Sequence, residues 1–386
     1  MSEFNIIIII VLSIILVHII LFFIRDRRYI KPFKIIKDPQ TISLKDLKEL
    51  PVVNFIIPAW NEGETFRKAL FSIKELYYPK INVVINAGGS EETVNIANSF
   101  KVHDNFKVIY QEKGGGKIKA INNCLPLIKE GLVYFIDADI YITDEVFLRM
   151  IHPIINLNEK VSMAGSRPLK DQQDKDFVKY LHINHSLSYR RIFERYGKEE
   201  LSGVNSCVSY DVIKKIGKFS ENRLYATDTS RGNDIRSHGF KLYNLIHYNS
   251  LIYTEIPERK KEFIKQRIRW IENSLMYSLE TNIKIMIRFF LLFFSSLYIL
   301  LWPLFLFFHS FFFLFGVYLI LNLYLLRVRR TIFFKITRKK QHDLKFSSRY
   351  YLKILYYIYI ELIVNIGTFF DFLFLKRNFK KRRNLA

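Results

Sequence analysis

A short apolar run in the middle of the chain ends abruptly in two carboxylates. Leu132–Ile136 is apolar throughout, and Asp137 and Asp139 follow it with one alanine between them. Unbroken apolar runs of this length are typical of strands buried on both faces of a parallel sheet. Open α/β sheets bind ligands at the carboxyl ends of such strands. Because Mg2+ and Mn2+ accept carboxylate and phosphate oxygens together, Asp137 and Asp139 predict a metal site that holds a diphosphate.

Strand-like and helix-like segments alternate before this run. Apolar runs at Val52–Ile57, Ile81–Ile85 and Lys107–Tyr110 are each followed by a segment with helical spacing. Such alternation predicts an α/β fold with a mostly parallel, doubly wound sheet and right-handed crossovers. We expect this domain to occupy residues 51–280.

Three local patterns give further structural predictions. Asn61 and Glu64 predict a capping box for the helix that follows them. Ser202–Ser206 is small and polar and predicts a turn. His182 and His185 have the spacing of metal ligands, but no further ligand stands near them in the sequence. We therefore interpret them as ordinary surface or half-buried histidines.

Three segments carry side chains suited to a phosphate or an acceptor, and each has a structural alternative. Gly114–Lys117 lacks the flanking residues of the common nucleotide-binding loops and by itself predicts a flexible turn with a solvated lysine. Asp228 suits either a helix N-cap or a catalytic carboxylate. Gln266, Arg269 and Trp270 share one face of a basic helix. There they could bind a phosphate and a sugar, or anchor the helix at a membrane surface.

The N-terminal end of the chain is apolar enough to cross a membrane. Phe4–Ile24 has about the length of a bilayer-spanning helix, and basic residues rather than a cleavage site follow it. These features predict an uncleaved anchor over residues 1–28, and residues 29–50 predict a connector along the membrane surface. The positive-inside rule then places the following domain in the cytoplasm.

The C-terminal region, residues 281–386, contains two to three further apolar segments. Ile283–Leu326 suits two crossings, whereas Tyr350–Leu375 contains Glu361 and is followed by a basic tail. A single crossing of this last segment would place the tail outside, against the positive-inside rule. A true span and an interfacial helix therefore both remain open for it.

Charge and cysteine content narrow the class of protein. The net charge is +23, but Lys and Arg gather beside the apolar blocks, which favours contact with membrane lipids over nucleic acid. Cys124 and Cys207 stand at no metal-binding spacing, so we expect free thiols in a reducing compartment.

The order of these motifs resembles one family. A strand with Pro-Ala-Trp-Asn-Glu, a glycine loop, Gly-Lys, Asp-Ala-Asp, Thr-Asp and Gln-x-x-Arg-Trp precede the C-terminal apolar helices. In this the chain is similar to the membrane-bound family 2 glycosyltransferases, which include cellulose, hyaluronan, chitin and poly-N-acetylglucosamine synthases and the ceramide glucosyltransferases. The resemblance covers about Val52–Leu326. It implies a GT-A (Rossmann-like) glycosyltransferase domain with a mostly parallel sheet, flanked by transmembrane helices.

The resemblance also implies roles for individual residues. Asp228 matches the general base, and Asp137 and Asp139 match the nucleotide and metal aspartates that would hold Mg2+ or Mn2+. Trp270 matches the acceptor-binding position. The implied nucleotide- and diphosphate-binding residues are Pro58, Asn61, Glu62, Asn86, Lys117, Asp137, Gln266 and Arg269.

The implied reaction is an inverting, metal-dependent transfer of a hexosyl or N-acetylhexosaminyl group from a nucleotide sugar to a growing polysaccharide, at the cytoplasmic face of the plasma membrane. Asn86 and Ala87 stand where the family has an acidic pair, which weakens the expected preference for a UDP-sugar. Thr227 stands where glutamate is common. Single-sugar transfer to a lipid acceptor and a non-catalytic membrane scaffold with the same fold remain alternatives.

Overall fold

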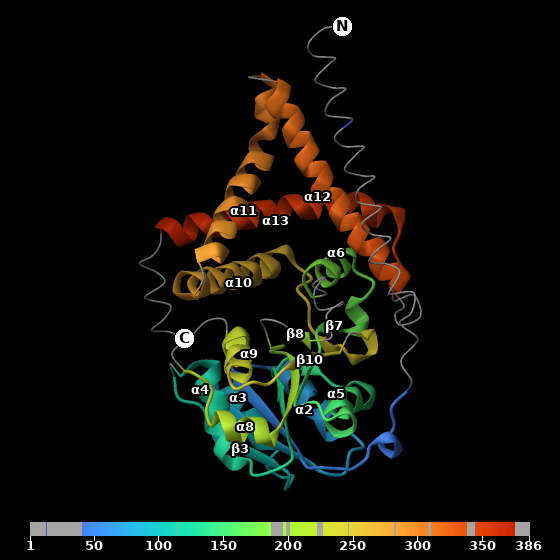
Figure 1. Cartoon of the computed structure of the whole chain (residues 1–386), viewed down its shortest axis with the longest axis vertical. Helices are drawn as coiled ribbons and strands as arrows, with labels where there is room; N and C mark the ends of the chain where they lie inside the picture. The colour runs from blue at the N-terminus through green and yellow to red at the C-terminus, as the bar shows by residue number, and fades with distance from the viewer. Residues whose placement is uncertain are drawn as a thin grey trace. The chain divides into compact units, whose positions relative to one another are not determined.

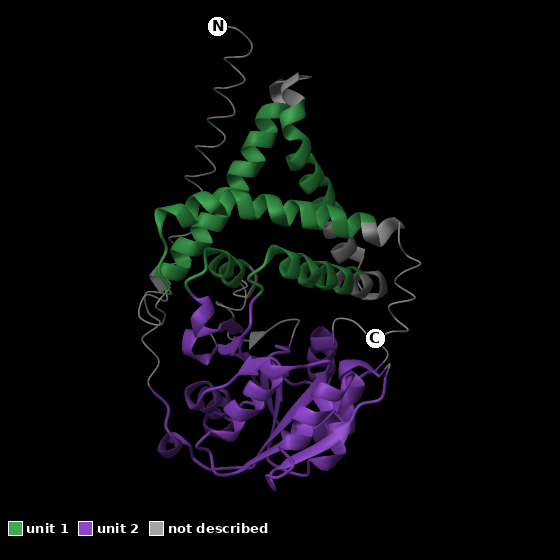
Figure 2. Ribbon diagram, turned by 180° about the vertical axis from the view of Figure 1, so that it is seen from behind, with its two compact units in different colours: residues 1–39, 174–184, 257–376 green, residues 40–173, 185–256, 377–386 purple. Residues whose placement is uncertain are grey.

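The computed structural model describes residue 13 and residues 41–113, 115–186, 196–197, 201–221, 227–245, 247–281, 283–307, 310–337 and 344–374. Apart from Ser13, the expected anchor lies outside the described residues, as do most of the connector and the basic tail. The chain divides into two compact units (Figure 2). Unit 1 comprises residues 1–39, 174–184 and 257–376, and unit 2 comprises residues 40–173, 185–256 and 377–386. Residues 257–280 therefore group with the C-terminal helices and not with the α/β unit.

Unit 2 is built on a mostly parallel sheet, which confirms the predicted α/β fold (Figure 1). Its strands are β1 Val53–Trp60, β2 Ile81–Gly88, β3 Phe106–Tyr110, β4 Leu132–Ile136, β6 Val161–Met163, β8 Tyr196–Gly197, β9 Asn205–Ser209 and β10 Leu242–Asn244. They lie in the order β3-β2-β1-β4-β9-β6-β10-β8. A second sheet has the order β5-β11-β7 and consists of β5 Ile140–Tyr141, β11 Ile252–Thr254 and β7 Ser166–Pro168.

The strand register brings three carboxyl ends to one edge of the large sheet. Trp60 at the end of β1 pairs with Gly88 at the end of β2. Ile56 of β1 pairs with Phe135 of β4, and the two strands are parallel. The loops that follow β1, β2 and β4 therefore leave the sheet on the same side, where ligands of α/β proteins bind.

Helices cover both faces of this sheet. They are α2 Glu64–Lys74, α3 Glu91–Ser99, α4 Gly116–Cys124, α5 Asp144–Leu157, α8 Tyr210–Ile216 and α9 Thr227–Ser237. Neighbouring residues of β1 pack on opposite faces of the sheet: Phe55 belongs to one buried hydrophobic cluster and Ile56 to the other. On the first face, Phe55 stacks on Tyr134 with ring centroids 4.8 Å apart. Because β1 and β4 are buried on both faces, the strands that end at the site are fixed in position.

The prediction of a turn at Ser202–Ser206 is wrong for its last two residues. Asn205 and Ser206 begin β9, which is antiparallel to both of its neighbours, β4 and β6. Both polar atoms of the buried Asn205 side chain are hydrogen-bonded: Oδ1 accepts from the Tyr134 hydroxyl at 2.6 Å, and Nδ2 donates to the Ser250 carbonyl at 3.2 Å. These distant partners allow a polar residue to stand in a central strand.

The predicted capping box at Asn61 and Glu64 is also wrong. The N-cap of α2 is Gly63, and Asn61 has a φ of +57°, in the left-handed region. The Glu64 carboxylate pairs with Arg67 at 3.1 Å. Asn61 is held in its unusual conformation by its backbone N–H, which donates to the Gly88 carbonyl at 3.2 Å.

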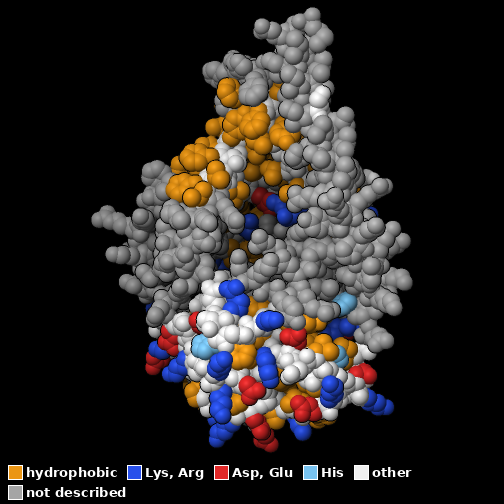
Figure 3. All heavy atoms as spheres, viewed as in Figure 1, with side chains coloured by type: hydrophobic (Ala, Val, Ile, Leu, Met, Phe, Trp, Pro, Cys, Tyr) orange, Lys and Arg blue, Asp and Glu red, His pale blue; other side chains and the backbone are white. Residues whose placement is uncertain are grey.

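Unit 1 is helical. Its elements are α6 Asp176–Leu181, α10 Lys260–Thr281, α11 Ile283–Leu301, a 3-10 segment Trp302–Phe307, α12 Ser310–Thr337 and α13 Ser348–Phe374. Within this unit α11 and α12 form a hairpin, and α10 and α13 run across its open end (Figures 1 and 2). Hydrophobic side chains gather on the surface of the hairpin (Figure 3).

Among the described residues of unit 1, two helical segments are long and apolar enough to cross a membrane. They are Phe312–Lys335, with 24 residues, and Ser348–Phe370, with 23 residues. The apolar part of α11, Phe290–Leu304, is shorter. His182, in the π-helical turn after α6, is fully buried, and its ring lies 6.0 Å from that of Phe334. The prediction of a surface or half-buried histidine is thus wrong for His182.

Candidate functional site

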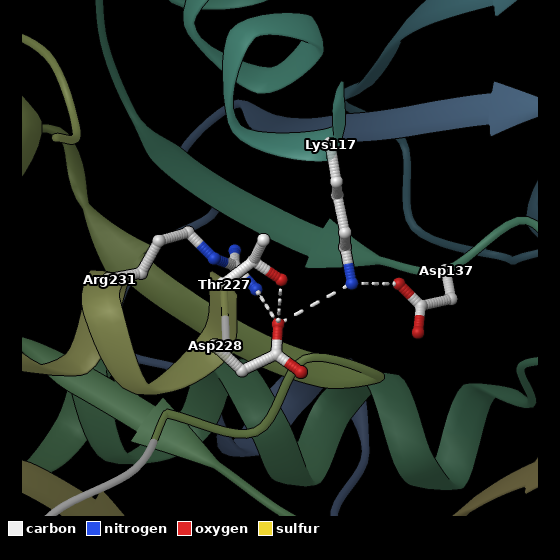
Figure 4. Close-up of polar contacts among 5 residues, drawn as sticks. All are labelled: Lys117, Asp137, Thr227, Asp228 and Arg231. Atoms are coloured by element: carbon white, nitrogen blue, oxygen red, sulfur yellow. Dashed lines mark hydrogen bonds and ion pairs between the residues drawn. The ribbon is translucent and has the colours of Figure 1, made fainter. Parts of the chain in front are cut away.

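Lys117 and Asp137 form an ion pair at the carboxyl edge of the large sheet. Asp137 directly follows β4, and Lys117 lies in the first turn of α4. The Lys117 Nζ atom lies 2.6 Å from Asp137 Oδ1, and both side chains are 27% exposed (Figure 4). The local prediction of a solvated lysine at this position is therefore wrong.

Asp228 approaches the same lysine from α9. Its Oδ1 atom lies 3.4 Å from Lys117 Nζ and 3.0 Å from Arg231 Nη2, and the Thr227 hydroxyl donates to it over 3.5 Å (Figure 4). These contacts all use one oxygen of the carboxylate. The structure thus brings together three residues that the sequence analysis had assigned to the site, Lys117, Asp137 and Asp228.

Gly203 makes room for the other oxygen of Asp228. A Cβ atom built on Gly203 would lie 2.0 Å from Asp228 Oδ2, closer than any real Cβ contact. Any other residue at this point would force the Asp228 carboxylate to move. Sequence analysis missed this role, because a glycine in a predicted turn gives no sign of the residue it faces.

Arg231 is a further residue of the site that sequence analysis missed. Its side chain is fully buried, with the guanidinium carbon 5.1 Å from the centre of the Phe135 ring. Its Nε and Nη1 atoms have no hydrogen-bond partner in the described part of the chain. The i, i+3 spacing from Asp228 was the available signal, since such residues are neighbours on a helix.

The two cations fix the charge of Asp228. Burial raises the pKa of this carboxyl, but the charges and hydrogen bonds of Lys117 and Arg231 outweigh burial and lower the pKa to about 2. Because 41% of the side chain stays exposed, we regard the cations as the dominant influence. Burial likewise opposes the charge of Lys117, but Asp137 and Asp228 outweigh it and raise the pKa of the ammonium group. Asp228 is therefore ionised at neutral pH.

Asp139 carries negative charge that the surrounding residues leave poorly compensated. The residue keeps an exposed surface, yet burial of the rest of the side chain, together with the charge of Asp137, raises its pKa to about 6. Among the described residues no group of three or more His, Cys, Asp and Glu side chains gathers into a metal site. A pair of carboxylates with excess negative charge suits a hard divalent cation that takes its remaining ligands from phosphate oxygens, so Asp137 and Asp139 fit such an ion.

The loop after β1 contributes backbone groups at the same edge. Pro58 lies inside β1 and pairs with Asn86. The Thr93 hydroxyl lies 2.7 Å from both the backbone N–H and the carbonyl of Glu62. Asn61 packs so closely on the next loop that a Cβ on Gly89 would lie 2.5 Å from its Oδ1 atom. The loops after β1 and β2 are thus interlocked.

Asn86 occupies an internal position in β2. Its side chain is fully buried, and Nδ2 donates to the Ala120 carbonyl of α4 over 3.0 Å. Only Oδ1 lacks a hydrogen-bond partner in the described part of the chain. The amide nitrogen therefore ties β2 to the helix that carries Lys117.

Gln266, Arg269 and Trp270 lie on α10, which belongs to unit 1. The structure gives their position within that unit only, so it does not test their predicted contact with the diphosphate and the acceptor. Arg269 and Trp270 are both exposed.

Comparison with known proteins assigns the family. The family model described as "Glycosyltransferase like family 2" matches residues 51–273. The chain belongs to this family. Among its relatives is the poly-beta-1,6-N-acetyl-D-glucosamine synthase of Staphylococcus epidermidis, 26% identical over 259 residues that cover 65% of this chain and 59% of the synthase. The probable glycosyltransferase YdaM of Bacillus subtilis is 23% identical over 243 residues, 58% of this chain and 56% of YdaM. The chain thus spans less than two thirds of the length of these relatives.

A solved structure supports the same fold assignment. The mannosyltransferase PcManGT from Pyrobaculum calidifontis, solved in complex with GDP-Man and Mn2+, aligns with a TM-score of 0.54 and 15% identity over 97% of this chain and 99% of its own. The GT-A fold predicted from the motif order of this family 2 chain is therefore confirmed.

Proposed function

We propose that this family 2 glycosyltransferase moves a sugar from a nucleotide-sugar donor onto a growing polysaccharide, with inversion at the anomeric carbon. The observation that carries the proposal is the row of charges in which Lys117 lies between Asp137 and Asp228. The similarity to a poly-beta-1,6-N-acetyl-D-glucosamine synthase supports a polysaccharide product. A UDP-sugar is the donor expected from the resemblance, although Asn86 and Ala87 replace its acidic pair.

The donor diphosphate would bind at the end of β4. Lys117 offers an ammonium group to its oxygens, and Asp137 and Asp139 would hold a Mg2+ or Mn2+ ion there. When bound, such an ion neutralises the charge that develops on the leaving diphosphate. The resemblance adds Arg269 and Gln266 as further diphosphate contacts and Trp270 as a platform for the acceptor sugar.

Asp228 would act as the general base. Its lowered pKa keeps it ionised, so it can accept the proton of an acceptor hydroxyl. The hydroxyl oxygen forms a bond to the anomeric carbon as the bond from that carbon to the diphosphate breaks, and the nucleoside diphosphate leaves with the bonding electrons. A single displacement from the opposite face inverts the anomeric configuration.

We place the enzyme at a membrane, with the α11–α12 hairpin inserted in the bilayer. The apolar span Phe312–Lys335 and the exposed hydrophobic surface of the hairpin support this placement. The basic residues beside the apolar segments support contact with anionic lipids.

The test is product analysis. Membranes that contain the full-length chain would be incubated with radiolabelled nucleotide sugars and Mn2+, and the products separated by length and anomeric configuration. Products of many inverted sugar units are expected, and Asp228→Asn membranes should yield none. Products with a single sugar on a lipid would show that the acceptor is a lipid and not a polysaccharide. An absence of transfer from every nucleotide sugar would favour a non-catalytic scaffold.

A further inference from the structure

In the described part of unit 1, three arginines gather around the carboxylate of Glu361. Arg327 of α12 donates to Glu361 of α13 over 2.7 Å. Arg330, three residues further along α12, donates to the Asn184 carbonyl over 3.3 Å and has Arg327 and Glu361 as electrostatic neighbours. Arg267 of α10 also lies within the electrostatic reach of Arg327 and Glu361. The cluster therefore carries three positive charges against the one negative charge of Glu361.

The hydrogen-bonding capacity of these arginines is incompletely used. The Nε atoms of Arg267, Arg327 and Arg330 are buried and have no hydrogen-bond partner among the described residues. Unpaired buried donors are costly, and native proteins keep few of them. The three side chains remain partly exposed, so a ligand from outside can reach them. An anion with several acceptor oxygens at the exposed part of these side chains would balance the charge, and a small turn of the guanidinium groups would let it pair the buried Nε donors as well.

The electrostatics of Arg267 agree with an excess of positive charge. Burial lowers the pKa of this guanidinium, and the charge of Arg327 acts in the same direction, against the opposing charge of Glu361. A group whose charged form is disfavoured gains from the approach of an anion. Phosphate suits such a group, because the parallel N–H donors of arginine match its oxygens.

The position of the cluster in unit 1 indicates the source of the phosphate. Arg327 and Arg330 stand near the end of the apolar span Phe312–Lys335, at the open end of the hairpin, where α13 crosses (Figures 1 and 2). A hairpin that enters the bilayer with its closed end first would leave this open end at the level of the lipid headgroups. Leu352 and Ile363 of α13 are 75% and 56% exposed, as suits a helix that lies on a bilayer surface.

We propose that Arg267, Arg327 and Arg330 form a binding site for the phosphate group of a membrane lipid. Arg267 and Arg330 are the main ligands, since Glu361 already holds Arg327. The proposal uses the membrane placement of the hairpin but not the sugar transfer, so it can fail or succeed independently of that reaction.

The test measures lipid affinity directly. Full-length protein in detergent would be titrated calorimetrically with dioctanoyl phosphatidic acid, with dioctanoyl phosphatidylcholine and with inorganic phosphate. We expect the phosphatidic acid to bind most tightly. Arg330→Gln should weaken its binding about tenfold or more, because a charged hydrogen bond is lost. Arg349→Gln, which removes an exposed arginine of α13 outside the cluster, should change it less than about twofold.

A second variant should change the affinity for phosphatidic acid in the opposite direction. Glu361→Gln removes the competing carboxylate and should tighten phosphatidic acid binding. If Arg330→Gln fails to fold, Arg267→Gln on a different helix carries the same expectation. Equal binding of inorganic phosphate and phosphatidic acid would overturn the lipid as the source of the phosphate. Lipid binding that is unchanged in Arg330→Gln, Arg267→Gln and Glu361→Gln would overturn the site itself.

Discussion

The Lys117 ammonium lies 3.4 Å from the Asp228 carboxylate while it pairs with Asp137 at 2.6 Å. One cation thus links the carboxylate assigned to the donor with the carboxylate assigned to the acceptor. A diphosphate that engages Lys117 would weaken its hold on Asp228, and the proton affinity of Asp228 would rise. Donor binding and activation of the base are therefore expected to be coupled.

Asp228→Asn should abolish most turnover and leave donor binding nearly intact. The amide cannot accept the proton, and general base catalysis contributes about a hundredfold to ten-thousandfold. The measurement is kcat together with the Kd for the donor. Asp211→Asn, which removes a carboxylate from an exposed surface pair with Lys160, serves as the matched control. A variant with normal turnover would remove Asp228 from the chemistry.

Lys117→Met should act mainly on donor affinity. The loss of a charged hydrogen bond to phosphate is worth about a tenfold to hundredfold rise in Kd. Nucleoside diphosphate binding can be followed by calorimetry. Lys119→Met is the control on the same helix, because Lys119 pairs only loosely with the exposed Glu112, at 3.7 Å. Equal effects of the two variants would contradict a specific role for Lys117.

Arg231→Leu should move the acid limb of the pH–rate profile to higher pH. The lowered pKa of Asp228, about 2, depends on Arg231 and Lys117, whereas burial acts in the opposite direction. Loss of Arg231 therefore raises the pKa, and a base that must be ionised becomes protonated at a higher pH. In the wild type this limb lies below about pH 4, so the profile of kcat between about pH 4 and about pH 8 should show a decline at its acid end only in the variant. Arg231→Lys keeps the positive charge, so its acid limb should stay at low pH, as in the wild type. A profile that neither variant moves would contradict the role assigned to Arg231.

Gly203→Ala should inactivate the enzyme with little loss of fold. The new methyl group would collide with Asp228 Oδ2, and displacement of a catalytic group by about 1 Å costs on the order of a hundredfold in rate. Gly367→Ala adds a methyl group that meets nothing within 4 Å and is the comparison. Thermal unfolding of both variants separates a displaced base from a disrupted fold, and a fully active Gly203→Ala would show that Asp228 can move without consequence.

Removal of divalent metal by chelation should lower activity, and Asp139→Asn should reproduce that loss. Excess negative charge at Asp139 favours a cation, and the amide removes it. In the wild type, Mn2+ with a nucleoside diphosphate should raise the midpoint of thermal unfolding. Asp139→Asn should lose this rise, whereas the exposed Asp171→Asn should keep it. A rise retained by Asp139→Asn would place the metal elsewhere.

The strand–helix alternation was sufficient to predict the parallel part of the sheet and the residues at its edge. Runs such as Leu132–Ile136 are apolar on both faces, so their burial is evident without knowledge of partners. β9 escaped prediction because Asn205 is paired by Tyr134 and Ser250, which stand 71 and 45 residues away. The local sequence indicates only the preference of a segment for strand, helix or turn, and hydrogen bonds to distant residues can override that preference.

Around Asp228, too, the sequence reveals some residues of the site and hides those that act through distant contacts. Asp228 itself was identified by its motif, but Gly203 and Arg231 matter only through what they face. A glycine in a turn and an arginine on a polar helix are both ordinary in sequence. Their roles depend on the close approach of α9 to the segment before β9 and to Phe135 of β4, which no short-range pattern describes.

The antiparallel strand β9 also imposes an order on synthesis. β4 pairs with β1 on one side and with β9 on the other, and every residue of β4 is buried. Until Asn205–Ser209 has left the ribosome, the apolar edge of β4 is open, and such edges recruit strands from other chains. At ordinary rates of translation this interval lasts roughly ten seconds. The yield of folded protein should therefore depend on how well the nascent chain is shielded during that interval.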